Sequence, residues 1–118
     1  MKMVEVKLLG VALQADLLNP KVVQKFETKF DETVKRIKAA SSEMTGSIAI
    51  KEQCSAIIDY VDDIFGEGSA EKVFGSEVDF LTCLEALDEM ASLYPEQVAP
   101  IIKKRTAKIN QKLKVIGE

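Results

Sequence analysis

The chain has 118 residues, a formal net charge of −3, two cysteines and no histidine. Without histidine, the Ser-His-Asp and Cys-His types of catalysis are excluded, as are most zinc sites. The length is enough for one ordinary hydrophobic core. We therefore expect a single domain, residues 1–118, that needs no disulfide, metal or other cofactor to fold.

No apolar segment of the sequence approaches the length of a membrane span. The run from Leu8 to Leu13 is also too short for the apolar part of a signal peptide, and Glu5 and Lys7 interrupt the residues before it. We therefore expect a cytoplasmic protein with reduced cysteines and no membrane partner.

The charges are distributed unevenly along the chain. Residues 1–58 hold nine Lys/Arg and seven Asp/Glu, residues 59–96 hold one and eleven, and residues 97–118 hold six and one. An acidic middle and a basic end can be the solvated faces of surface helices, or they can attract a partner or a second copy of the chain.

Two short segments near the N-terminus have the pattern of strands. Apolar side chains alternate along residues 4–8 and again along residues 11–15, with Gly10 between them. This predicts a β-hairpin within residues 1–16 that has one apolar face. Two strands alone are marginal in water, so that face must lie on helices or be joined by another chain. Val4 and Val6 are therefore candidate contacts for self-association or for a partner.

Apolar residues recur at steps of three and four in the rest of the chain, which predicts a helical region over residues 20–114. Asn19 can cap its start, and Pro20 is tolerated at the first helical position. The long helices are expected over residues 20–39, 48–65, 77–93 and 96–114. The predicted fold class is α+β, mainly α, with an N-terminal β-hairpin followed by about four long helices and one short helix.

The stretch FGEGSAEKVFGS, residues 65–76, places three glycines between two predicted helices. It is neither a dinucleotide fingerprint nor a P-loop, because Glu71 stands where each motif needs another residue, and its carboxylates would repel a phosphate. The stretch is typical instead of two helix ends, each followed by a helix start. The structural caps predicted for the whole chain are Asn19, Ser47, Gly66, Gly68, Ser69, Gly75 and Ser76.

Two acidic clusters lie on successive predicted helices, and their members are Asp59, Asp62, Asp63, Glu85, Asp88 and Glu89. Paired clusters of this kind resemble the magnesium sites of all-α nucleotide pyrophosphatases. At about 100° per residue, however, these carboxylates lie opposite the apolar stripe of their own helix and face water. We therefore expect no metal site and no catalytic residue, and a magnesium-dependent nucleotide pyrophosphatase is the alternative.

The last predicted helix carries the cations Lys103, Lys104, Arg105, Lys108, Lys112 and Lys114. A protein that reads DNA usually has a basic domain and a recognisable reading element, whereas this chain is acidic and has neither, so we expect no nucleic-acid partner. Cations near a helix C-terminus also favour its dipole. The candidate contacts to an acidic partner or to a second copy are Lys103, Lys104, Arg105 and Lys108.

Three stretches together resemble a family of small tail assembly chaperones from siphophages and prophages of Gram-positive bacteria. They are ADLLNPKVVQKFE (residues 15–27) after the hairpin, FGEGSAEKVFGS (residues 65–76), and CLEALDEM (residues 83–90). The resemblance covers most of the chain up to about Met90, and the final helix is less typical of the family.

The resemblance implies a binding role rather than catalysis. Such chaperones associate with the long tape measure protein, keep it soluble and help tail tube subunits to assemble around it in the bacterial host cell. Relatives self-associate into curved or spiral assemblies, and many exist in a short and a frameshifted longer form. We therefore expect a non-enzymatic, homo-oligomeric tail assembly chaperone whose partners are the tape measure and tail tube proteins. A generic helical adaptor is a further alternative.

Overall fold

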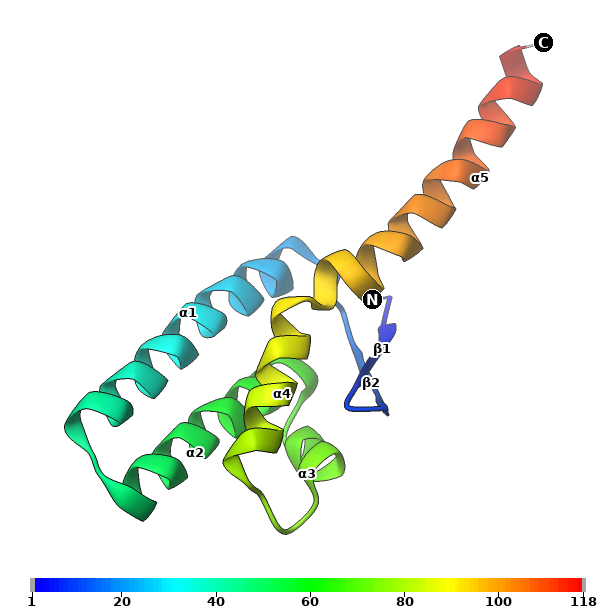
Figure 1. Ribbon diagram of the computed structural model, residues 1–118. Helices are drawn as coiled ribbons and strands as arrows, with labels where there is room; N and C mark the ends of the chain where they lie inside the picture. The colour runs from blue at the N-terminus through cyan, green and yellow to red at the C-terminus, as the bar shows by residue number, and fades with distance from the viewer. Residues whose placement is uncertain (1, 118) are drawn as a thin grey trace.

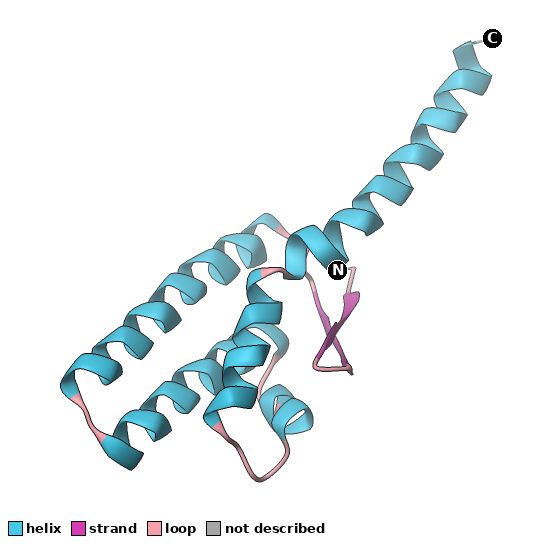
Figure 2. Ribbon diagram, in the orientation of Figure 1, coloured by secondary structure: helices cyan, strands magenta, loops and turns pink. Residues whose placement is uncertain are grey.

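The computed structural model describes residues 2–117, so Met1 and Glu118, at the ends of the predicted domain, lie outside the described range. In this range the chain forms a β-hairpin, four long helices, one short helix and a π-helical turn (Figures 1 and 2). The predicted mainly helical α+β fold is confirmed. The elements are β1 (Val4–Leu8), β2 (Val11–Ala15), α1 (Pro20–Glu43), α2 (Gly46–Phe65), α3 (Ser69–Phe74), α4 (Phe80–Ala91), η1 (Tyr94–Val98) and α5 (Ala99–Gly117).

The predicted hairpin is present, with β1 antiparallel to β2 and Leu8 opposite Val11. The two turn residues, Leu9 and Gly10, have φ of +49° and +81°. Two successive positive φ angles match the right-handed twist of the flanking strands. Gly10 adopts its angle without steric cost, whereas Leu9 is a non-glycine residue in this uncommon conformation. Because side chains alternate across a strand, Val4, Val6 and Leu8 all point to one face, and that face is buried.

The hydrophobic core lies where the apolar face of the hairpin meets α2, α4 and η1. Helix α1 runs alongside α2 and closes one side of this core (Figure 1). The Phe26 ring of α1 meets the Tyr94 ring of η1 edge-on, with 4.9 Å between the ring centroids. The largest fully buried side chains are Tyr60, Leu8, Leu17, Ile57, Met90, Leu93, Val61, Val98 and Cys83.

The start of α1 is capped by a side chain. The Oδ1 atom of Asn19 accepts a hydrogen bond from the Lys21 N–H at 3.0 Å, and Pro20 is the first helical residue. The predicted cap at Ser47 is wrong, because α2 already begins at Gly46 and Ser47 is its exposed second residue. Thr45 occupies the capping position there without a side-chain hydrogen bond.

The glycine-rich stretch does contain two helix ends. Gly66, with φ of +106°, follows α2, and Gly75, with φ of +74°, follows α3. Gly68, at φ +90°, precedes the first residue of α3, Ser69, so the predicted cap at Ser69 is wrong. The Ala70 N–H, in the first turn of α3, donates to the Asp62 carboxylate of α2 at 2.8 Å.

The predicted cap at Ser76 is also wrong, because α4 begins at Phe80 rather than near Glu77. Asp79 caps this helix, since its Oδ1 accepts from the Thr82 N–H at 2.8 Å and its Oδ2 from the Thr82 hydroxyl at 2.7 Å. These hydrogen bonds stabilise the ionised carboxylate and lower the pKa of Asp79. A short acidic side chain can cap as well as serine does.

The last helical segment begins with a wide turn. In η1 the Ala99 N–H donates to the carbonyl of Tyr94, five residues earlier. In a regular α-helix the ring of Pro100 would clash with the carbonyl four residues before it, and Pro100 has no N–H to donate to that carbonyl. A π-helical turn is one way to accommodate such a break. The chain then continues as α5, which projects away from the preceding elements, β1 to η1, which together form the body of the protein (Figure 1). The molecule has extents of 68 × 25 × 22 Å.

We expect Asn19→Ala to lower the free energy of unfolding by about 1 kcal/mol, because the first turn of α1 loses its side-chain acceptor. Ser47→Ala is the matched control at the position where a cap is absent, and it should change the free energy of unfolding by less than about 0.5 kcal/mol. Urea denaturation followed by circular dichroism measures both. An equal loss in the two variants would contradict the assignment of these caps.

Candidate functional site

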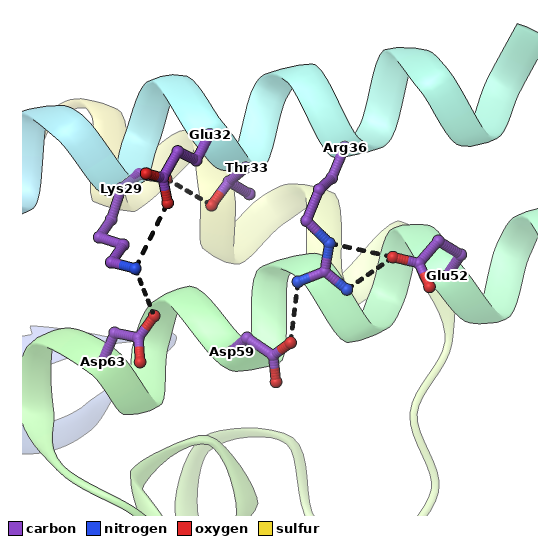
Figure 3. Close-up of polar contacts among 7 residues, drawn as sticks. All are labelled: Lys29, Glu32, Thr33, Arg36, Glu52, Asp59 and Asp63. Carbon is purple, nitrogen blue, oxygen red and sulfur yellow. Dashed lines mark hydrogen bonds and ion pairs between the residues drawn. The ribbon is translucent and has the colours of Figure 1, made fainter.

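The carboxylates of the first acidic cluster are held by α1 (Figure 3) and by α3. The Arg36 guanidinium of α1 lies 2.8 Å from the Asp59 carboxylate and 2.6 Å from the Glu52 carboxylate. The hydrogen bond that Arg36 donates to Asp59 is the main reason why the pKa of Arg36 is raised. The Lys29 ammonium lies 3.8 Å from the Asp63 carboxylate. Asp59 and Asp63 therefore join α1 to α2, and Asp62 holds the start of α3.

The second acidic cluster lies elsewhere. The Glu89 carboxylate accepts a hydrogen bond from the Leu9 N–H at 2.9 Å and so holds the hairpin turn to α4. Glu85 and Asp88 are on the exposed face of α4. Within residues 2–117 no three His, Cys, Asp or Glu side chains form a group that could hold a metal ion. The fold therefore does not bring together the six acids of the pyrophosphatase alternative.

The strongest pKa shifts belong to residues that pack in the core. Burial, with a hydrogen bond to Cys54, raises the pKa of the Cys83 thiol to about 12. Burial also raises the pKa of Tyr60, whose hydroxyl donates to the carbonyl of Phe26 at 3.1 Å. Groups shifted in this direction stay protonated at neutral pH. Cys54 and Cys83 are free and buried, and they pack in the core.

The candidate contacts at the hairpin are not accessible. Val4 and Val6 are 8% and 2% exposed, so the hypothesis that they contact a partner is wrong, because their side chains fill the core of their own chain. The edge of β1 is also occupied at its middle. The side-chain amide of Gln97 accepts from the Lys7 N–H at 2.7 Å and donates to the Lys7 carbonyl at 2.8 Å. Gln97 thus takes the place of a neighbouring strand.

The basic candidates, by contrast, are all exposed on α5. After Val98, which is fully buried, every residue of α5 through Ile116 is exposed. The helix nevertheless carries an apolar stripe at steps of three, four and seven residues. Its members are Ile102, Ile109, Leu113 and Ile116, which are 47%, 57%, 58% and 81% exposed. Nothing in residues 2–117 covers this stripe.

A second stripe of α5 is basic. At about 100° per residue it is centred roughly 90° from the apolar stripe around the helix. Ile101, Lys104, Arg105 and Lys108 line one hollow of about 330 Å³ on this side, and Lys112 continues the stripe. Residues 99–117 contain no acidic side chain. Helix α5 therefore presents two adjacent surfaces, one apolar and one positively charged.

An acidic hollow lies at the other end of the body. It has a volume of about 490 Å³ and is formed by α2, α3 and the segment before α4. The half-buried side chains of Ile58 and Phe74 and the more exposed Val78 give it apolar walls. Its carboxylates are Asp62, Glu67 and Glu71. Sequence reasoning named Asp62 only as a possible metal ligand, and it could not place residues 58 and 78 side by side.

The fold and these surfaces define a mainly helical protein with an exposed C-terminal helix. Residues 9–114 match the model of a family described as a family of unknown function (DUF6673), and the chain belongs to this family. No curated protein and no solved structure matches the chain. Among residues 2–117, no helix combines the length and apolar character that crossing a membrane requires.

Because the residues of α5 through Ile116 are exposed and do not pack in the core, removal of residues 103–118 should change the free energy of unfolding by less than about 0.5 kcal/mol. Val98→Ala is the matched comparison at the last buried position, and we expect it to cost about 2 kcal/mol. Thermal and urea denaturation of both variants measure these values. A loss above about 2 kcal/mol on truncation would contradict the separation of α5 from the core.

Proposed function

We propose that the protein is a non-enzymatic phage tail assembly chaperone, which binds the tape measure protein, helps the tail tube to assemble and associates with further copies of itself. It acts in the cytoplasm of the bacterial host cell. The proposal is supported by the resemblance of three stretches to that family and by one structural observation, the uncovered apolar stripe of α5.

The three stretches lie in the part of the fold that carries α5. Residues 15–27 join the hairpin to α1, residues 65–76 join α2 to α4 through α3, and residues 83–90 are the middle of α4. Together they contribute Leu17, Phe26 and Met90 to the core. The resemblance therefore concerns the body that carries α5, while α5 itself supplies the exposed contact surface.

An exposed helix with an apolar stripe suits one kind of partner. Such a stripe binds an amphipathic helix by placing side chains at positions i, i+3, i+4 and i+7 against those of the partner. Complete burial of one isoleucine or leucine contributes about 1.5–3 kcal/mol. Three or four such residues can therefore hold an extended helical client, which is the character expected of a tape measure protein.

The coding DNA offers one test of the proposal. We expect a slippery heptanucleotide near the codons for residues 112–117 and a gene for a tape measure protein downstream. Sequencing of the locus checks both. A locus with neither feature would count against the chaperone function.

Direct binding offers a second test. Ile109→Asp should weaken binding of the tape measure protein at least about tenfold, because it places a charge in the centre of the apolar stripe. Asn110→Asp is the matched control, since it adds the same charge about 100° away on α5. Calorimetric titration or co-purification after co-expression measures the effect. If the wild-type protein does not bind, or if both variants bind equally well, the proposed role of this stripe is wrong.

A further inference from the structure

The basic stripe of α5 and the acidic hollow of the body carry opposite charges around an apolar centre. On α5, Ile101 is surrounded by Lys104, Arg105 and Lys108. In the hollow, apolar walls are surrounded by the three carboxylates of Asp62, Glu67 and Glu71. An apolar centre with a charged rim of opposite sign on each side is the arrangement of a protein interface.

The two surfaces of one molecule cannot meet each other. The acidic hollow precedes the first residue of α4, and α5 begins beyond its last residue. Helix α4 lies between them and has 12 residues, which corresponds to a length of about 18 Å. Helix α5 then runs away from α3 (Figure 1). The basic stripe therefore needs the acidic hollow of another molecule.

Pairing between two α5 helices along their basic stripes is unfavourable. Residues 99–117 carry six cations and no acid, and like charges at an interface repel each other. Residues 59–96 carry eleven acids and one cation, Lys72, and Lys72 does not line the hollow. The charges of the chain thus favour a contact between its end and its middle over a contact between two ends.

A second hollow gives a useful comparison. It lies between α1 and α4, has a volume of about 300 Å³, and includes Phe30 and Ala91 with the carboxylates of Glu27 and Asp31. It is smaller than the hollow at α3 and carries two acids instead of three. It therefore fits the basic stripe less well.

We propose that the basic stripe of α5, centred on Ile101, docks into the acidic hollow formed by Ile58, Glu67, Glu71 and Phe74 of a second copy of the chain. Each copy can bind one neighbour through its basic stripe and another neighbour through its acidic hollow. The contact is therefore head-to-tail. Such contacts continue into an open chain unless the rotation between copies closes a ring. The apolar stripe of α5, about 90° away, stays available to a client.

This inference rests on the proposed function, of which self-association is a part, and it names the surfaces that join the copies. Because the contact depends on opposite charges, it should be strong at low salt and weaken as salt screens them. Light scattering of the full-length protein should give a mass that rises beyond the dimer with concentration at low salt. At about 1 M salt the mass should fall toward that of a monomer.

The test reverses charges on each surface separately. Arg105→Glu with Lys108→Glu should weaken self-association at least about tenfold, because acid would then face acid. Lys103→Glu with Lys114→Glu is the matched control, since it makes the same change of net charge on the other side of α5 and should have little effect. All four residues are exposed, and circular dichroism and thermal denaturation verify that each variant folds.

The same test applies to the hollow. Glu67→Lys with Glu71→Lys should weaken self-association as strongly, because both carboxylates face the proposed partner. Glu27→Lys with Asp31→Lys, in the second hollow, is the matched control with little expected effect. A mixture of the α5-reversed and hollow-reversed proteins should restore assembly, because every contact between unlike molecules is again between opposite charges.

Several results would overturn the inference. They are a wild-type protein that stays monomeric at low salt and high concentration, controls that lose assembly equally, or a mixture that does not reassemble. Binding of the tape measure protein is measured on the same variants. A client bound normally by a charge-reversed protein that has lost self-association supports the separate roles of the two stripes. If the mixture reassembles but the wild-type protein binds no client, the proposed contact between copies is supported and the chaperone function is contradicted.

Discussion

The direction of α5 depends on how residues 93–98 are held against strand β1. Leu93 and Val98 are fully buried in the core that the hairpin shares with α2 and α4, and the Gln97 amide makes both hydrogen bonds that a neighbouring strand would make to Lys7. These contacts fix the π-helical turn on the body. Every residue from Ala99 to Ile116 then lies beyond the last buried side chain. A helix of this length is marginal in water by itself, so its order depends on its anchored start.

Much of the fold could be predicted because it follows from local signals. Alternation over residues 4–15 gave the hairpin, and the spacing of apolar residues gave the four long helices. The capping positions were less predictable, because a polar side chain remote in sequence can replace a local cap. Asp62 of α2 binds the Ala70 N–H, and Asp79 rather than Ser76 defines the start of α4. The Asp62 contact joins two helices and lies outside any local capping pattern. The Asp79 cap, by contrast, is local, because Thr82 is only three residues away.

The candidate site was predictable only in part. The basic character of the last helix and its apolar stripe can be found from the sequence alone. The sequence does not tell whether that stripe is buried in the core or exposed on the surface, since an amphipathic helix has the same pattern in both cases. Val4 and Val6 were predicted to contact a partner but are buried. The apolar face of a strand has the same sequence pattern whether its own chain or another chain covers it. The acidic hollow combines residues from α2, α3 and the segment before α4, and only the fold brings them together.

Hydrogen exchange of α5 reports whether this helix is protected by its own body or by a partner. In dilute protein at high salt, we expect amides of residues 103–116 to exchange at least about a hundredfold faster than those in the middle of α2. At low salt and high concentration, and on addition of a helical client, the same amides should slow while those of α2 stay unchanged. Protection of α5 equal to that of α2 in the dilute, high-salt sample would mean that α5 is not an exposed helix awaiting a partner.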